Sequence, residues 1–287
     1  MAQLIVNADD FGLTQGVNRA IAELHRAGAL TSTTLMARAK ATLDAIEIAR
    51  TTPSLGVGCH VVLVDGEPVL PANELPSLVD QRSGRFQPSL GAFLRRLALG
   101  RIDPAEIEAE ANAQIALLQA CGIALTHVDT HKHTHKFPAV LRSVLRAARA
   151  AGISAVRNSF EPPWSVRATP GAPWLRSAQV TLLRRLQPAF RRIVAEESFV
   201  TTDGAIGVLA TGTLNSATLN SLLQHLPPGA WELVTHPAYN DADLARAGTR
   251  LLASRQLELA ELPTLHQFPA IQLISFADLK TGQEPQI

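Results

Sequence analysis

The sequence predicts an α/β protein, folded as a single deformed (β/α) barrel of about seven parallel strands, and two observations support this fold. Short apolar runs of strand length alternate along the chain with longer segments whose apolar residues recur at helical spacing. That alternation is typical of a parallel sheet covered by helices. Seven or eight such units favour a closed or nearly closed barrel, with its active site at the C-terminal ends of the strands. A doubly wound open sheet is the alternative.

Eight segments are predicted to be strands, and three segments are the clearest helices. The strand candidates are residues 3–8, 31–36, 57–63, 125–130, 154–157, 205–210, 231–235 and 271–276. Residues 15–27 have apolar positions at helical spacing and end before Gly28, where a helix stop is expected. Residues 103–121 begin with an Asp-Pro pair typical of a helix N-terminus, and residues 137–151 are rich in alanine.

Two segments interrupt this alternation. Residues 64–102 contain several Pro and Gly residues, and residues 159–203 contain two tryptophans, several prolines and the only basic amphipathic stretch, 178–194. Both segments are predicted to be insertions in one catalytic domain that spans residues 1–287. Long ordered loops at the C-terminal end of a barrel often form substrate walls.

Composition excludes some classes of protein. Of the 287 residues, 46% are hydrophobic and 18% are charged, which is enough apolar material for a core. The formal net charge of +1 gives no reason to expect a nucleic-acid partner. The two cysteines, Cys59 and Cys121, are far apart and lack metal-ligand spacing, so free thiols in a reducing compartment are expected.

The N-terminus does not resemble a signal peptide, because Asp9 and Asp10 interrupt its short apolar run. No stretch approaches the roughly 18 consecutive apolar residues that predict a membrane span. A cytoplasmic protein is therefore expected.

Two adjacent carboxylates, Asp9 and Asp10, lie where the first apolar strand runs out into a turn. Neighbouring residues on a strand point to opposite faces, so both side chains can converge on one site only where the strand is ending. We therefore expect two roles: Asp10 binds a divalent metal ion, and Asp9 remains free as a base. The alternative is a pair that caps a helix or stabilises a turn.

Four histidines and an aspartate occur at alternating positions in and after the strand at 125–130. They are His127, Asp129, His131, His133 and His135. One tetrahedral metal ion cannot take four imidazoles together with an aspartate and an open position, so some of these residues must have other roles. If the strand ends near Thr130, His131 lies at the rim, and His127 and Asp129 point inward. The alternative is a solvated loop that binds metal adventitiously, and the roles of His133 and His135 stay open.

Two further histidines lie in or after apolar strands. His60 interrupts the run 57–63, and together with His131 and the carboxylate at the end of the first strand it would make an Asp-His-His set. His236 precedes Pro237 at the end of the strand 231–235. A histidine there can serve as a general acid, because its unperturbed pKa lies near neutrality. The alternatives are a hydrogen-bonded core residue for His60 and a surface turn for His236.

Four ordered motifs resemble those of the YdjC-like carbohydrate deacetylases, a family related to the polysaccharide deacetylases and their deformed (β/α) barrel. The motifs are Asn-Ala-Asp-Asp-Phe-Gly at 7–12, the strand around His60, the alternating histidines at 127–135 and His236-Pro237. The resemblance covers most of the chain and implies hydrolysis of an N-acetyl group on an amino sugar. The site that it implies has Asp10, His60 and His131 as metal ligands, Asp9 as base, His236 as acid and Arg157 near the base.

The metal expected at this site is a single divalent ion. Zinc suits two imidazoles and one carboxylate, whereas magnesium prefers an oxygen shell. Family members are nevertheless often described with magnesium, so both metals are retained, with zinc favoured.

The segment 159–203 resembles the hopanoid-biosynthesis-associated branch of the family, which implies an N-acetylglucosaminyl hopanoid as substrate. The basic amphipathic stretch 178–194 would then contact the inner face of a membrane. Three alternatives remain open: a deacetylase of soluble chitooligosaccharides, another metal hydrolase such as a phosphoesterase, and a non-catalytic protein that binds a sugar or lipid.

Overall fold

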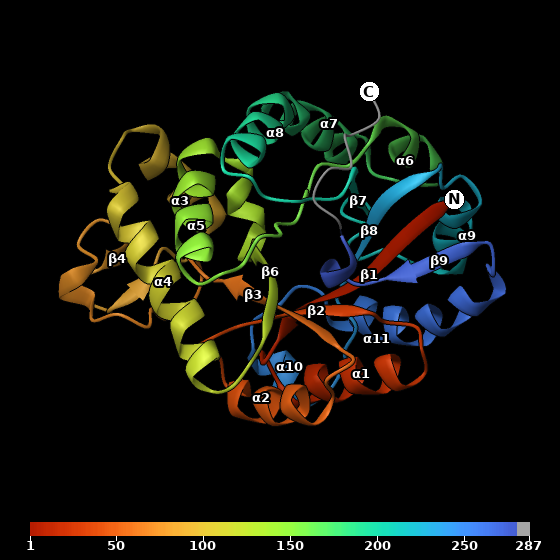
Figure 1. The fold of residues 1–287 in the computed structure, drawn as a ribbon, viewed down its shortest axis with the longest axis horizontal. Coiled ribbons are helices and arrows are strands. Elements are labelled where there is room, and N and C mark those ends of the chain that lie inside the picture. Colours follow the sequence, from red (N-terminus) through yellow and green to blue (C-terminus); the bar gives the residue numbers. More distant parts are fainter. Residues whose placement is uncertain (280–287) are drawn as a thin grey trace.

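The centre of the molecule is a seven-stranded sheet of parallel strands that curls into a half-barrel (Figure 1). The computed structural model describes residues 1–279, and the end of the predicted domain, 280–287, lies outside the described part. The strands are β1 (Ala2–Phe11), β2 (Ser32–Leu35), β3 (Gly56–Val61), β6 (Leu125–Thr130), β7 (Gly204–Ile206), β8 (Gly229–Thr235) and β9 (Ile271–Ile274). They pair in the order β6-β3-β2-β1-β8-β7, and β9 pairs with β1. The prediction of an α/β fold on a parallel sheet is confirmed.

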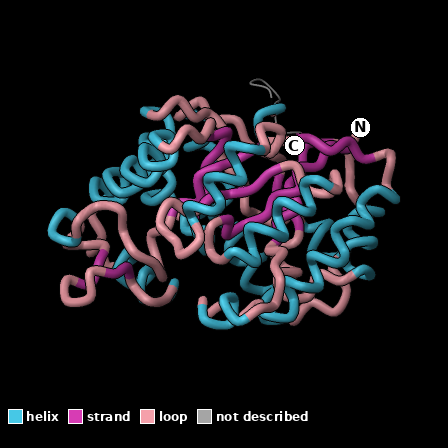
Figure 2. The backbone as a smooth tube through the Cα atoms, turned by 90° about the horizontal axis from the view of Figure 1, so that it is seen from below, coloured by secondary structure: helices cyan, strands magenta, loops and turns pink. Residues whose placement is uncertain are grey.

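Helices surround the sheet, and the tube view shows the strands gathered inside them (Figure 2). The helices around the half-barrel are α1 (Gln15–Arg26), α2 (Thr42–Thr51), α4 (Pro104–Ala120), α5 (Pro138–Ala150), α9 (Ser216–Gln224), α10 (Ala242–Arg246) and α11 (Leu252–Glu261). The three predicted helices correspond to α1, α4 and α5. The Thr14 hydroxyl caps α1 by accepting from the Val17 N–H, and the apolar side chains of Val17, Ile21 and Leu24 are buried as their spacing predicts.

Residues 154–157 do not form the predicted strand. This segment makes single bridges to β6 and to Val200, and three residues later the Phe160 carbonyl accepts a hydrogen bond from Ala205 of β7 at 3.2 Å. Irregular backbone therefore spans the space between the two edge strands β6 and β7. Arg157 lies in this connecting segment.

The strand ends that differ most from the prediction are those of β1 and β7. β1 continues to Phe11, beyond its predicted end at residue 8. β7 ends at Ile206, whereas the sequence predicts a strand to residue 210. Gly207 has a φ of +86°, and a Cβ atom there would lie 2.8 Å from the Val234 carbonyl oxygen, so the chain turns at a position that only glycine fits.

The two segments predicted to be insertions have secondary structure of their own. Residues 64–102 form the antiparallel pair β4 (Val79–Asp80) and β5 (Arg85–Phe86), followed by α3 (Leu90–Ala98). Residues 159–203 form α6 (Pro163–Ala168), α7 (Trp174–Leu183) and α8 (Gln187–Glu196). In Figure 1 the first group lies at the left, away from the central sheet, and the second lies along the top. Within residues 1–279, no helix has both the length and the apolar character that a membrane span requires.

Candidate metal centre and active site

The two adjacent aspartates lie in a β-bulge rather than at a strand end. The pairing of β1 with β2 shifts between Ala8 and Phe11, so Asp9 and Asp10 together lie opposite a single residue of β2. Asp10 has a left-handed φ of +65°, a conformation that aspartate adopts more readily than most residues. The bulge breaks the alternation of faces, and both carboxylates lie within 4.8 Å of the same His60 ring.

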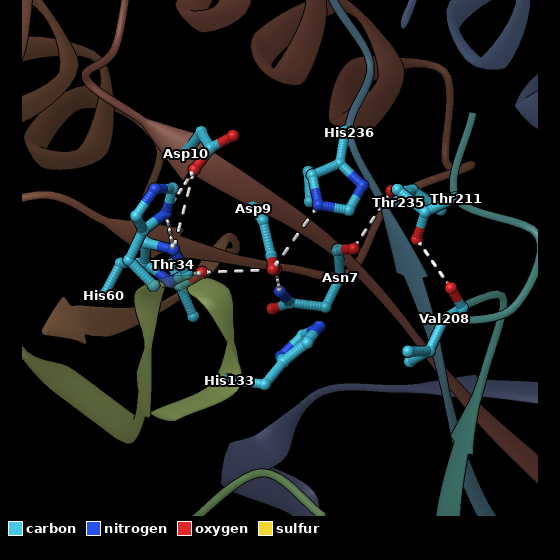
Figure 3. Close-up of polar contacts among 12 residues, drawn as sticks. Asn7, Asp9, Asp10, Thr34, His60, His133, Val208, Thr211, Thr235 and His236 are labelled. Carbon is cyan, nitrogen blue, oxygen red and sulfur yellow. Dashed lines mark hydrogen bonds and ion pairs between the residues drawn. The ribbon is translucent and has the colours of Figure 1, made fainter. Parts of the chain in front are cut away.

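Three donor atoms from separate elements meet beside this bulge. Asp10 Oδ1 lies 3.6 Å from His60 Nε2 and 3.3 Å from His131 Nδ1, and the two ring nitrogens are 3.2 Å apart. Ligands held about 2.1 Å from a tetrahedral ion lie about 3.4 Å from one another. The spacing of the three atoms therefore fits one metal ion, and Figure 3 shows Asp10 and His60 directed toward each other. His131 is the first residue after β6, at the rim where the sequence places it.

His60 is oriented by a second aspartate. His60 Nδ1–H donates to Asp129 Oδ1 at 2.7 Å, which leaves Nε2 facing Asp10 and His131. Burial alone would lower the pKa of His60, but Asp129 and the bulge carboxylates raise it to about 9. Without a metal the ring therefore carries a proton at neutral pH. Metal binding must displace that proton, so metal affinity rises with pH.

A second possible donor set, Asp9, His60 and Asp129, shares the same histidine. Its two carboxylates are bound by a single guanidinium. Arg157 donates through Nη1 and Nη2 to the two oxygens of Asp9 at 2.8 and 2.6 Å, and its Nη1 also donates to Asp129. A cation placed between these carboxylates would lie against Arg157 and be repelled. The geometry therefore favours the set that contains Asp10.

Asp9 is held in the charged form close to the proposed metal position. Burial alone would raise the pKa of Asp9, but Arg157, His60 and His236 together hold it below its usual range. Asn7 Nδ2 donates to the same carboxylate at 3.0 Å. His236 Nε2 lies 3.8 Å from Asp9 Oδ2, and Figure 3 shows the His236 ring facing this carboxylate.

His236 is neutral at pH 7. Burial lowers its pKa to about 4, and the nearby Asp9 charge offsets this effect only in part. The near-neutral pKa on which the sequence interpretation relied therefore does not hold. The backbone N–H of His236 donates to Glu258 on α11, which fixes the chain just after β8.

A family comparison covers most of the chain. The family model described as YdjC-like protein matches residues 3–268. The chain belongs to the YdjC-like family. It is 34% identical over 283 residues to a protein of Brevibacillus brevis named carbohydrate deacetylase, covering 96% of this chain and 99% of that protein. A carbohydrate deacetylase of Thermoanaerobacter pseudethanolicus is 28% identical over 260 residues, which cover 90% of this chain and 89% of that protein.

A solved structure has the same architecture as this YdjC-like chain. A candidate cellobiose-phosphate cleavage protein of Enterococcus faecalis V583 superimposes with a TM-score of 0.76 at 25% identity. The superposition covers 96% of this chain and 97% of that structure. The similarity thus includes the half-barrel and the segments that follow its strands.

Arg157, expected near the base, and His127, expected to point inward, have clear positions in this YdjC-like fold. Arg157 is fully buried and binds Asp9, Asp129 and Glu232, so it contacts the base and not a substrate. The His127 ring is also fully buried and stacks on Phe276 with the ring centroids 3.8 Å apart. We assign His127 to the packing of the half-barrel.

Sequence reasoning missed three charged residues that complete the site of this YdjC-like protein. Arg255 on α11 donates to Asp10 Oδ2, Glu232 on β8 accepts from Arg157 Nε at 2.7 Å, and Glu258 anchors His236. All three are at least 98% buried. Arg255 and Glu258 lie on one turn of a helix, where charged residues usually face solvent, so no local pattern reveals them. The one available signal was a charged residue, Glu232, inside the otherwise mostly apolar strand β8.

Arg255 is expected to set the affinity of the metal site, because it fixes the Asp10 carboxylate by binding the oxygen that faces away from the histidines. Replacing Arg255 with Lys keeps the positive charge but loses the planar guanidinium. We expect zinc affinity, measured by competition with a chromophoric chelator, to fall roughly tenfold. Replacing the exposed Arg250 with Lys is the matched control. Unchanged or tighter zinc binding in Arg255→Lys would show that orientation of Asp10 by Arg255 is unimportant.

Proposed function

We propose that this chain is a metal-dependent carbohydrate deacetylase that hydrolyses the N-acetyl group of an amino sugar. The observation that carries the proposal is the spacing of Asp10 Oδ1, His60 Nε2 and His131 Nδ1 at 3.2 to 3.6 Å, beside a carboxylate that is not part of this set. Two full-length relatives named carbohydrate deacetylase support the same chemistry.

The donor set favours zinc over magnesium, since two of its three atoms are imidazole nitrogens. When bound, the ion would polarise the acetyl carbonyl and make a water molecule more acidic. The Arg255 contact occupies the second oxygen of Asp10, so this carboxylate offers one donor and leaves room for water and substrate.

The residues of the chain would then move the protons. Asp9, oriented by Arg157, accepts a proton from the attacking water as its oxygen bonds to the acetyl carbon. His236 is neutral, so it must first gain a proton; the proton that Asp9 takes from the water can pass to His236 Nε2, which lies 3.8 Å from Asp9 Oδ2. Protonation of the nitrogen by His236 lets the C–N bond break, because an amine leaves poorly unless it is protonated. The products are acetate and a free amino sugar.

Acetate release from a panel of N-acetylated sugars tests the proposed function. The protein would be stripped with a chelator and assayed alone, with zinc and with magnesium. We expect acetate only after a metal is restored, with zinc the more effective ion. Hydrolysis of an aryl phosphate without acetate release would select a phosphoesterase instead. Sugar binding without acetate release under any condition would select a non-catalytic binding protein.

A lipid-linked amino sugar, such as an N-acetylglucosaminyl hopanoid, is the substrate we favour over soluble chitooligosaccharides. The supporting observation is α7, which buries none of its side chains and exposes Trp174, Leu175 and Leu182 to 76%, 58% and 57%. Two arginines, Arg184 and Arg185, follow the helix directly. An apolar surface next to arginines suits the boundary between lipid and anionic headgroups, so this part of the protein would contact the inner face of the membrane.

Vesicle binding is expected to depend on this apolar surface. Replacing Trp174, Leu175 and Leu182 together with Ser should lower binding to anionic vesicles at least about tenfold in a sedimentation assay, because three apolar side chains no longer enter the bilayer. Replacing Leu43, which is 82% exposed elsewhere, with Ser is the control. Equal binding by the triple variant would contradict the membrane proposal. Faster deacetylation of soluble chitobiose than of a glycolipid would contradict the substrate proposal.

A further inference from the structure

The 3-10 helix that follows β6, residues His131–Lys136, brings a second histidine to the same end of the half-barrel as the metal set. Lys132 and His133 both have left-handed backbones, with φ of +57° and +53°, so the chain curls sharply after His131. Figure 3 shows His133 and Asp10 on opposite sides of the Asp9 carboxylate. The His133 ring is half-buried.

We propose that His133 binds the substrate by donating a hydrogen bond from Nε2–H to a hydroxyl oxygen of the sugar ring, and that Thr130, His135 and Ser159 fix the tautomer that makes this possible. The proposal rests on the proposed function, because it takes an amino sugar as the substrate. It assigns a role to the two histidines whose roles the sequence leaves open.

The direction of this hydrogen-bond chain is set at Thr130. Its hydroxyl oxygen accepts from the backbone N–H of His135 at 2.9 Å and from the Thr134 hydroxyl at 2.9 Å. Both lone pairs are then in use, so the Thr130 hydrogen must go to its remaining neighbour, His135 Nδ1, at 2.8 Å. His135 Nδ1 is therefore an acceptor and carries no hydrogen.

The same reasoning gives the donor and the acceptor in the hydrogen bonds from His135 to Ser159 and from Ser159 to His133. A ring that accepts at Nδ1 carries its hydrogen on Nε2, so His135 Nε2–H donates to Ser159 Oγ at 2.8 Å. The other histidine in contact with Ser159 Oγ is His133, whose Nδ1 lies 3.2 Å away. The Ser159 hydrogen therefore points to His133 Nδ1, and the hydrogen of His133 is on Nε2. Burial lowers the pKa of His135, in agreement with a neutral ring.

The Nε2–H of His133 has no hydrogen-bond partner within residues 1–279, although its ring is fixed through Nδ1. A neutral donor suits a neutral oxygen, and a sugar offers hydroxyl oxygens. The acetyl group is expected on the side of the metal set, which does not include His133. Since His133 and Asp10 lie on opposite sides of Asp9, we expect His133 to meet the sugar ring beyond the acetyl group.

Steady-state kinetics on two substrates test the contact with the sugar. Replacing His133 with Ala should raise KM for an N-acetylated disaccharide about tenfold, with kcat changed less than about twofold, since one neutral hydrogen bond in the bound state is lost. Replacing it with Gln, whose amide nitrogen can take the place of Nε2, should restore most of the binding. In His133→Ala, kcat/KM for the disaccharide should fall about tenfold relative to kcat/KM for p-nitrophenyl acetate, which has no sugar. Equal losses on both substrates would overturn the proposed contact.

The tautomer can be measured without any activity. In protein labelled with 15N-histidine, the nitrogen shifts should show hydrogen on Nε2 of both His133 and His135, with the His133 signals assigned from the Gln variant. Replacing Ser159 with Ala should leave His133 as a mixture of tautomers, whereas Ser165→Ala, which removes a buried hydroxyl bound to Glu161, should not. Hydrogen on Nδ1 of His133 in the unaltered protein overturns the proposal. If the shifts show hydrogen on Nε2 of both histidines but no sugar is deacetylated, the proposed function fails and the tautomer assignment stands.

Discussion

Replacing Asp9 with Asn is expected to lower kcat for acetate release by about a thousandfold, while the protein keeps its metal ion. A general base contributes roughly 100- to 10,000-fold to a rate, and the amide cannot accept the proton of the attacking water. The Asn side chain keeps the shape of Asp and one oxygen that can accept from Arg157, so the fold should be retained. Metal content, measured by elemental analysis, should remain at one ion per chain.

Replacing Asp10 with Asn is the matched experiment, because the two aspartates are neighbours with different contacts. Asp10 Oδ1 lies within 3.6 Å of both ring nitrogens of the metal set, whereas both oxygens of Asp9 are bound by Arg157. Asp10→Asn should therefore lose metal and activity together, as should His60→Ala. If Asp9→Asn loses the metal and Asp10→Asn keeps it, the two assignments must be exchanged.

The strands that support the site could be predicted because their pattern is local. Apolar runs of strand length identify β1, β3 and β8, and alternating polar residues identify β6; the polar residue at or after the end of each strand is a candidate site residue. His131 lies at the rim because β6 ends at Thr130, as the sequence suggests. The bulge could not be predicted, since neither residue of the Asp9-Asp10 pair is glycine and nothing nearby marks Asp10 as left-handed.

No local pattern predicts the charged residues behind the site, because their partners are distant in sequence, and Arg157 is expected near the base only from the family resemblance. Arg255 and Asp10 are separated by 245 positions, and Arg157 and Asp9 by 148. Arg157 reaches the base only because the segment between β6 and β7 is irregular, whereas the sequence predicts a strand there. In a regular strand its neighbours would alternate between the two faces, and no pattern in 154–157 indicates which residue points inward.

These distant contacts explain how three carboxylates can lie together away from solvent. Asp9, Asp129 and Glu232 are each at least 98% buried, and all three bind the guanidinium of Arg157. One positive charge cannot neutralise all three. Burial accordingly raises the pKa of Glu232 to about 7, even though Arg157 lowers it. Since this pKa exceeds that of an exposed glutamate, the folded state binds more protons than the unfolded state between about pH 4.5 and 7, and the contribution of Glu232 to stability falls as pH rises through this range.

Replacing Arg157 with Met is expected to lower the free energy of unfolding by roughly 3–5 kcal/mol at pH 8, because it leaves buried carboxylates without their partner. Without the guanidinium their pKa values rise, so the loss should be smaller at pH 5, where Glu232 is already protonated. Adding Glu232→Gln to Arg157→Met should recover part of the loss at pH 8, since one buried charge is removed. Urea unfolding at both pH values measures these changes in the free energy of unfolding.

The control is Arg142→Met, which removes a solvent-exposed ion pair with Glu196 and should change stability by less than about 1 kcal/mol. If Arg157→Met lowers the free energy of unfolding as little as Arg142→Met does, or lowers it more at pH 5 than at pH 8, the charge cluster does not stabilise the fold. The role of Arg157 would then be to orient Asp9.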